Sequence, residues 1–302
     1  MRGTHWIVAA FIQCVALSLL SPMITRAEPR VPRPDAAPRS ESYSFKLASF
    51  NSQEVADSQE TSTVTITETS DNHWEIEGPV FLRSADPEPP GEVIVKNIFG
   101  WETTKGGGSD DFEYELEIEW GIVQDHELIF ELPFEIGDGH VEGNGDLTLG
   151  WHWRLWDEQD ALPAFAMRNL IRVPTGVDSS GVDYTWRGLF TKTLIPGTMR
   201  LHVNPFLSSI NGENEEDARP FRWGTAIGVD YRLADDLLLV TDYKYENGQF
   251  EHTRDNHSAE FGLDWRIADH QKLGFALEVG LDGDSEGPSL GAKISYMFSF
   301  GG

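Results

Sequence analysis

Hydrophobic and polar residues alternate strictly along several stretches of the chain. Residues 112–120 read FEYELEIEW, with apolar residues at the even positions and glutamate at the odd positions. A helix would scatter these glutamates around its circumference, whereas a strand places them all on one side. The same alternation returns at 128–136, 147–155, 221–231, 259–267, 273–281 and 294–300. The pattern therefore predicts β-strands, each with one apolar and one polar face.

Twelve such segments follow one another through the second part of the chain. We place them at 92–102, 111–122, 127–136, 145–156, 162–173, 183–194, 199–210, 220–233, 236–247, 257–267, 272–282 and 289–300. Short connections such as VQDH and IPGT alternate with longer ones rich in glycine and acid, such as TTKGGGSD and NGENEEDAR. With an even number of strands, all short turns fall at one end and all long loops at the other, as in outer-membrane barrels with both termini in the periplasm. The sequence therefore predicts an all-β fold, a twelve-stranded antiparallel transmembrane β-barrel.

A soluble β-sandwich or a lipocalin-like barrel would show the same alternation, with the apolar face turned inward. Three features favour the membrane barrel. Aromatic residues such as Trp101, Trp120 and Tyr184 stand near strand ends, where interfacial girdles lie. The chain nearly ends on an aromatic strand at 296–300, as assembled outer-membrane barrels do. The alternation of loop lengths is the third feature.

The chain before the barrel divides into two regions. Residues 1–27 have the pattern of a secretory signal peptide: Arg2, an apolar core at 6–20 and small residues before the end at Ala27. Residues 28–90 are rich in proline, serine and acid, which favours a flexible periplasmic segment, with a hairpin at 61–82 as an open alternative. Residues 91–302 then make up the barrel.

Charge and cysteine content exclude several classes of protein. The chain carries 23 Lys+Arg and 50 Asp+Glu, a net charge of −27. Removal of residues 1–27 leaves 21 basic and 50 acidic residues, a net charge of −29. Nucleic-acid binding needs a basic surface and is excluded. Cys14 is the only cysteine, which excludes an internal disulfide framework or a cysteine zinc site. No apolar run after residue 20 approaches the ~20 residues of a membrane-spanning helix.

Short motifs along residues 92–300 resemble a known family. These are Glu119-Trp120-Gly121-Ile122, Glu131-Leu132-Pro133-Phe134, the run from Gly143 to Gly150 (GNGDLTLG) and Val173-Pro174-Thr175-Gly176, in that order. They are similar to motifs of the bacterial outer-membrane family labelled MetA-pathway of phenol degradation. The resemblance implies an outer-membrane barrel with a role in the transport of small organic compounds. Residues 1–90 lie outside it.

The polar parity of the strands predicts which side chains line the lumen. The second to fourth strands carry almost only acids on that parity, and the remaining strands carry acids and bases together. The candidates are Glu113, Glu115, Glu117, Glu119, Glu131, Glu135, Asp146, His152, Arg154, Arg172, Arg187, His202, Arg222, Asp230, Lys244, Asp264, Arg266, Glu278 and Lys293. A net negative wall would draw cations and polar solutes.

The sequence predicts no catalytic residue, metal or cofactor. No G-x-S-x-G or H-E-x-x-H motif occurs, and the apolar faces offer no serine–histidine pair to lipid. His252 and Asp255 could be arranged as in an outer-membrane protease, but a solvated loop is the simpler interpretation. Asp282, Asp284 and Glu286 alternate as calcium ligands can, yet fall short of a full EF-hand loop and read as an acidic surface loop.

Two classes of function remain, with an enzyme as a distant third. One is a channel for small solutes with an acidic, cation-preferring lumen. The other is a non-conducting structural or adhesive barrel whose lumen is braced by salt bridges. The expected partners are outer-membrane lipids, the barrel-assembly machinery, small solutes and divalent cations at the acidic outer loops, and no nucleic acid.

Overall fold

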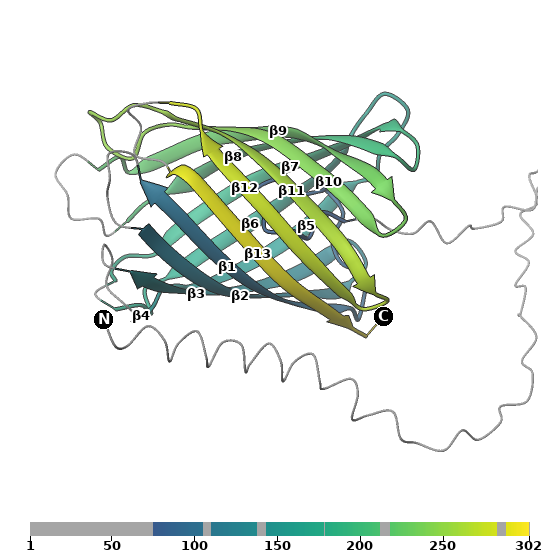
Figure 1. Cartoon of the computed structure of the whole chain (residues 1–302), viewed down its shortest axis with the longest axis horizontal. Helices are drawn as coiled ribbons and strands as arrows, with labels where there is room; N and C mark the ends of the chain where they lie inside the picture. The colour runs from purple at the N-terminus through teal and green to yellow at the C-terminus, as the bar shows by residue number, and fades with distance from the viewer. Residues whose placement is uncertain are drawn as a thin grey trace, which may run out of the picture. The chain divides into compact units, whose positions relative to one another are not determined.

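The computed structural model describes residues 75–104, 110–137, 143–177, 179–211, 218–282 and 288–301. The described residues belong to one compact unit, 68–302. Its elements are β1 (Val93–Thr104), β2 (Asp110–Val123), β3 (His126–Gly137), β4 (Gly143–Asn144), β5 (Leu147–Trp156), β6 (Ala164–Val173), β7 (Asp183–Ile195), β8 (Met199–Ser209), β9 (Phe221–Ala234), β10 (Leu237–Glu246), β11 (Asn256–Ala268), β12 (Gln271–Gly280) and β13 (Pro288–Phe300). Figure 1 shows the strands tilted around a common axis.

Each strand pairs antiparallel with its neighbours, and the sheet closes on itself. β1 pairs with β13, so that Val93 lies opposite Phe300, and β2 pairs with both β1 and β3. The two-residue strand β4 pairs with the end of β3, next to the longer pairing of β3 with β5. The prediction of an all-β, twelve-stranded antiparallel barrel is therefore confirmed, since β4 and β5 together occupy one strand position.

The break between β4 and β5 has a local cause in Pro133 of β3. Proline has no N–H to donate to a ladder, so prolines in sheets mark bulges or strand ends. Here the N–H of Gly145 donates to the carbonyl oxygen of Pro133 at 2.8 Å. A Cβ on Gly145 would lie 2.9 Å from the Pro133 ring. Glycine therefore lets the chain pass the proline before the regular pairing resumes at Leu147.

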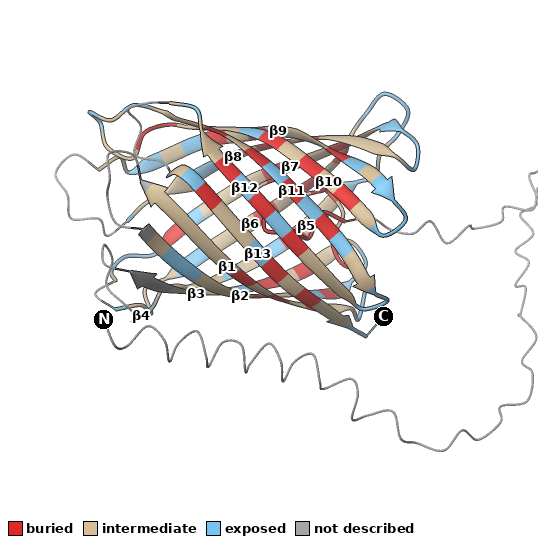
Figure 2. Cartoon of the chain, in the orientation of Figure 1, coloured by how far each residue is buried: buried red, intermediate tan, exposed pale blue. Residues whose placement is uncertain are grey.

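The two faces of the barrel wall differ sharply in polarity. Outward side chains include exposed aromatic and aliphatic residues on almost every strand, among them Phe130, Trp151 and Phe261. Inward positions carry buried polar residues such as Glu117, Asp230 and Glu260. Figure 2 shows this alternation of buried and exposed residues along the strands. An apolar exterior around a polar interior is the arrangement of a transmembrane barrel and the reverse of a soluble one.

The connections define two ends of the barrel. We call one the short-turn end: it holds the start of β1, the end of β13 and the connections 124–125, 157–163, 196–198, 235–236 and 269–270. The other, the long-loop end, is where the chain leaves β1, β3, β6, β8, β10 and β12. The connections fall at the ends predicted for them, but 157–163, predicted to be short, is longer than the connection between β1 and β2, predicted to be long.

The interior is occupied by a stretch without regular secondary structure, residues 75–90, which we call the lumen segment. Its residues Ile76, Val80 and Leu82 are buried in a cluster with inward side chains of β9, β10 and β12. The composition of 28–90 predicts a flexible periplasmic segment outside the barrel. The described part of that region instead packs within the barrel, because its few apolar side chains meet small inward residues such as Ala226 and Ala276.

Some predictions concern residues beyond those described. The signal peptide at 1–27 and most of the hairpin at 61–82 lie outside the described residues. The part of the chain that the structure describes contains no helix long and apolar enough to span a membrane.

Candidate functional site

The backbone of the lumen segment is held by side chains of the barrel wall. Six backbone N–H groups donate to inward side chains of four strands: Glu77 and Gly78 to Asp264 (3.2 and 2.9 Å), Phe81 to Glu260 (2.6 Å), Arg83 to Asn204 (2.7 Å), Ala85 to Thr191 (2.8 Å) and Glu88 to Glu127 (3.0 Å). A buried backbone N–H needs such a partner, and the lumen segment has no strand ladder of its own to provide one for each residue. The wall therefore supplies what a sheet neighbour would otherwise provide.

Glycines on the inward face make room for this segment. A Cβ on Gly262 of β11 would lie 2.5 Å from Cγ1 of Val80, and one on Gly274 of β12 would lie 2.6 Å from Cδ of Pro79. A Cβ on Gly121 of β2 would meet the carbonyl oxygen of Pro89 at 2.1 Å. Any larger residue at these positions would displace the lumen segment. The inward face of the wall is thus shaped to the segment that fills it.

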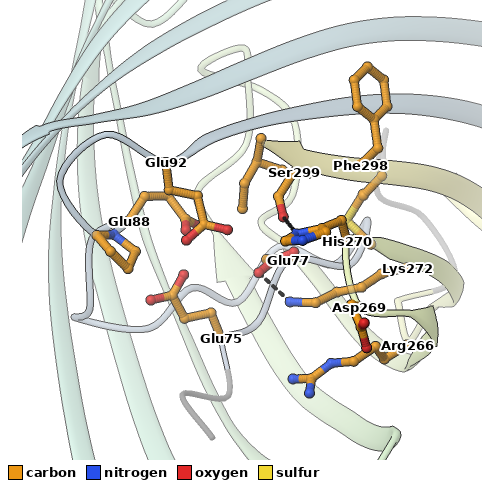
Figure 3. Close-up of a pocket in the computed structure, with 13 residues that line it drawn as sticks. Glu75, Glu77, Glu88, Glu92, Arg266, Asp269, His270, Lys272, Phe298 and Ser299 are labelled. Atoms are coloured by element: carbon orange, nitrogen blue, oxygen red, sulfur yellow. Dashed lines mark hydrogen bonds and ion pairs between the residues drawn. The ribbon is translucent and has the colours of Figure 1, made fainter. Parts of the chain in front are cut away.

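The ends of the lumen segment come back together. It extends from β11 and β12 across to β8, β7 and β3, as its hydrogen bonds show. Yet carboxylate oxygens of Glu75, Glu77 and Glu88 all lie within 4.8 Å of one another. The segment therefore forms an arch inside the lumen, with both feet toward the short-turn end. Figure 3 shows the three carboxylates around a common space, with Glu77 paired to Lys272 of β12.

Two cavities lie on either side of the arch. The outer cavity, of about 210 Å³, faces the long-loop end, and its lining includes Phe81 and Arg83 of the lumen segment. The inner cavity, also about 210 Å³, lies at the short-turn end between the feet of the arch and the ends of β11, β12 and β13. The lumen segment separates them, so neither cavity runs through the barrel.

Charged groups of the lumen form one dense cluster on the β1–β3 side. Arg168 of β6 donates to Glu117 at 3.0 Å, to Glu119 at 3.2 Å and to Glu131 at 2.8 Å. Lys96 of β1 lies 3.7 Å from Glu117 and also pairs with Glu119. The wall that the sequence presents as almost purely acidic therefore receives two buried cations from neighbouring strands.

Neither of these cations is among the lumen residues predicted from the sequence, for different reasons. Arg168 has the same parity in its strand as Arg172, which is predicted to face the lumen, so the sequence did contain the signal for Arg168. Lys96 stands in VIVKNIFGW, where apolar residues occupy both parities and no face can be identified as inward. Arg83, which lies 4.0 Å from Glu117, belongs to a stretch with no periodicity at all.

The predicted lumen residues fall into separate groups in the structure. The outer cavity is lined by Glu113, Glu115, Glu117, Glu131, Arg187, Lys244, Glu278 and Lys293. Arg266 lines the inner cavity, and Glu119 and His152 line a small cavity between the arch and the wall. Asp264 holds the arch, whereas His202 and Asp230 pair with each other at 3.3 Å.

The remaining candidates lie near the barrel ends. Arg154 pairs with Asp86 of the lumen segment at 3.2 Å, and Arg222 pairs with Glu246. Arg172 pairs with Asp183 and lies 3.7 Å from Asp146. Asp282 lies 3.4 Å from His257. The side chain of Glu135, and all of Asp284 and Glu286, lie outside the described residues.

Glu88 and Asp146, two of the acidic groups outside the strands, have pKa values shifted in opposite directions. At Glu88, burial and the adjacent carboxylates of Glu75 and Glu77 raise the pKa well above its usual range. At Asp146, partial burial favours the neutral form, but hydrogen bonds from Ser179 and from backbone N–H groups outweigh it and lower the pKa. The charged form of Glu88, at the foot of the arch, is therefore destabilised by its surroundings. The charged form of Asp146, between β4 and β5, is stabilised by its hydrogen bonds.

Comparisons with known proteins identify the fold. No protein family and no curated protein matches the sequence. Among solved structures, the COG4313 outer membrane channel from Pseudomonas putida F1 is 14% identical with a TM-score of 0.57, over 72% of this chain and 98% of that one. The NanC porin is 10% identical (TM-score 0.51; 68% and 98% covered), and the KdgM porin in complex with disordered oligogalacturonate is 9% identical (TM-score 0.51; 68% and 99% covered).

These similarities establish the barrel fold of outer-membrane channels for this chain. At such low identity they carry nothing about solute or charge preference. The resemblance to the MetA-pathway family stays a hypothesis, since no family match supports it.

Proposed function

We propose that the chain is an outer-membrane channel for small solutes. In this proposal residues 1–27 direct export, and the short-turn end with both mature termini faces the periplasm. The long-loop end then faces outward, and the outer cavity is the first space that a solute meets. Small organic compounds are the solute class that the family resemblance implies.

The observation that carries this proposal is the polar, cavity-containing lumen inside an apolar exterior. A structural barrel needs only a filled interior, but here about 210 Å³ stays open on each side of the lumen segment. Charged side chains line both cavities, so water and small polar solutes can enter them. The lumen segment is held by hydrogen bonds and a small apolar cluster rather than by strand pairing. Its displacement would connect the two cavities.

The outer cavity favours cations over anions by a modest margin. Its lining includes six carboxylates and five basic side chains. Three of the carboxylates are compensated: Glu117 and Glu131 by Arg168, and Glu278 by Lys244 at 3.8 Å. Glu113, Glu115 and Glu260 form no ion pair within 4.0 Å among the residues that the structure describes. The lining therefore has an excess of one carboxylate, to which Glu113 and Glu115 contribute in this proposal.

A non-conducting barrel is the second candidate, and the ion cluster around Arg168 supports it. Three carboxylates and two cations brace the lumen beside the arch. If the lumen segment stays in place and blocks the lumen, the barrel has a structural or adhesive role in which its loops make the contacts.

Conductance of the purified mature chain in planar bilayers separates these candidates. The channel proposal expects small discrete openings, with a reversal potential that indicates cation preference under a salt gradient. The double change Glu113→Gln and Glu115→Gln should shift that potential toward zero, while Glu246→Gln, in an ion pair near the long-loop end, serves as a matched control. Absence of openings would favour the scaffold. Anion preference would contradict the role given to Glu113 and Glu115.

A further inference from the structure

We propose that the outer cavity binds a small zwitterion, with Arg187 of β7 recognising its carboxylate and Glu113 and Glu115 of β2 recognising its ammonium group. The inference rests on the proposed function, because it takes the outer cavity as the space that a solute enters from outside. It names the class of that solute. A small aliphatic amino acid is the simplest compound of this class.

The starting observation is an arginine without a carboxylate partner. Arg187 lines the outer cavity, and among the residues that the structure describes it forms no ion pair within 4.0 Å. Arginine has five N–H donors, and Arg187 uses one of them to reach the carbonyl oxygen of Phe81 at 3.3 Å. Its Nε is buried and has no hydrogen-bond partner in the described part of the chain. Buried donors are rarely left without an acceptor, so this guanidinium has donors available for a ligand.

Phe81 of the lumen segment holds this guanidinium in place. The centre of its ring lies 4.0 Å from Cζ of Arg187 and 4.9 Å from Nζ of Lys244. Stacking on a ring occupies the face of a guanidinium and leaves its N–H edge, which binds a carboxylate through two parallel hydrogen bonds. Lys244 already has a partner, since Nζ lies 3.8 Å from Glu278. Of the two cations on Phe81, Arg187 is therefore the one available to a carboxylate.

The carboxylates of the proposed site come from another part of the wall. Glu113 and Glu115 of β2 line the same cavity and form no ion pair within 4.0 Å among the described residues. Around the barrel, β3, β5 and β6 lie between β2 and β7. Arg187 and the two carboxylates therefore approach the cavity from different directions, and a solute between them meets opposite charges at its two ends.

Lys293 of β13 is the nearest cation to the two carboxylates in the strand pairing. Gly100 of β1 lies opposite both Lys293 and Glu113, and a Cβ on Gly100 would lie 3.8 Å from Cγ of Lys293 and from Oε2 of Glu113. Lys293 therefore offsets part of the charge of Glu113 and Glu115. One lysine beside two carboxylates still leaves negative charge for an ammonium group.

The size and the apolar lining of the cavity suit a small aliphatic body. The volume is about 210 Å³, roughly seven times the ~30 Å³ that one water takes up in the liquid. Val80, Ile98 and Leu170 line it together with the charged residues. A simple anion would leave the two carboxylates without a partner, and a simple cation would leave Arg187 without one. A zwitterion satisfies both, which is the basis of the expected selectivity.

The test measures binding to the complete mature chain, folded in detergent, with three compounds of one carbon skeleton. L-valine has both charged groups, 3-methylbutanoate lacks the ammonium group and 2-methylpropylamine lacks the carboxylate. Equilibrium dialysis with the radiolabelled compounds at neutral pH gives each Kd. We expect valine to bind at least tenfold more tightly than either of the other two. This measurement does not require the barrel to conduct.

Each variant should remove the preference for one charged group. Arg187→Gln should weaken valine binding at least tenfold, so that valine binds no more tightly than 2-methylpropylamine. The double change Glu113→Gln and Glu115→Gln should remove the advantage of valine over 3-methylbutanoate. Arg222→Gln is the matched control, because Arg222 pairs with Glu246 and is not part of the outer-cavity lining, and it should leave the Kd of valine unchanged.

Heat-modifiable mobility on a gel shows which variants are folded, and Arg187→Met replaces Arg187→Gln if the latter does not fold. Failure of valine to bind, or equal binding of valine and 3-methylbutanoate, would overturn the assignment of a zwitterion. Valine binding that the Arg187 variant leaves intact would overturn the role of Arg187. Openings in planar bilayers without valine binding would overturn this inference and leave the channel proposal standing. Valine binding without openings would support this inference and contradict the channel.

Discussion

Removal of the Leu82 side chain should loosen the lumen segment without unfolding the barrel. Leu82 is 0% exposed and packs with Val80, Ala226 and Val240 between the arch and the wall. A buried Leu→Ala change costs about 2–5 kcal/mol. Since the barrel strands do not depend on this side chain for pairing, the cost falls on docking of the arch. A loss of about 3 kcal/mol would raise the undocked fraction roughly 150-fold.

Cysteine labelling can measure that fraction. The only cysteine of the sequence is Cys14, so Ser84→Cys in a Cys14→Ser background introduces a single thiol into the lumen segment. Ser84 is 5% exposed, and a charged thiol reagent reaches it only when the arch undocks. We expect labelling of Ser84→Cys to accelerate by one to three orders of magnitude when Leu82→Ala is added. Leu233→Ala, on the outward face and 50% exposed, is the matched control.

Equal labelling rates in the Leu82→Ala and Leu233→Ala backgrounds would refute this reasoning. They would mean that hydrogen bonds to the wall, rather than apolar packing, hold the arch. Slow labelling in all backgrounds, with the barrel folded, would mean that the arch does not leave at all.

Three further changes test other parts of the structure. Phe130→Arg, on the outward face of β3, should cost roughly 2–4 kcal/mol if it faces hydrocarbon, measured by urea unfolding in liposomes; a neutral effect would contradict the membrane exterior. Gly262→Val should displace the arch through its clash with Val80 and expose residues 75–90 to protease, whereas an unchanged digest would show that the wall can yield. At Glu158, partial burial raises the pKa, but hydrogen bonds from Lys192 and Thr193 outweigh it and lower the pKa. Glu158 therefore contributes about a fraction of a kcal/mol to stability at pH values above its pKa in the unfolded chain. That contribution is lost as the pH falls through its pKa in the folded chain. The Glu158→Gln chain should therefore lose less stability on acidification than the native chain, and an identical pH dependence would contradict this.

The strands were predictable because their information is local. In FEYELEIEW the alternation of apolar and polar residues shows which side chains share a face of the strand. The same alternation in the other strands gives the closed barrel its apolar exterior and polar interior. The alternation of short and long connections predicted which of them lie at the same end of the barrel. Even the break at Pro133 follows from a property of one residue, the missing N–H.

The lumen segment could not be read in this way. Residues 75–90 have no period, and their proline and acid content is typical of an unfolded tail. They are ordered because side chains of different strands, among them Asp264, Asn204 and Thr191, accept hydrogen bonds from their backbone N–H groups, and because their apolar side chains pack against the wall. The contacts within the outer cavity and within the ion cluster around Arg168 likewise depend on tertiary structure. Sequence parity assigns Glu117 and Arg168 to the interior, but strand tilt and barrel closure decide that they meet across it. Parity is a property of one strand, whereas contact across a lumen is set by the geometry of all twelve.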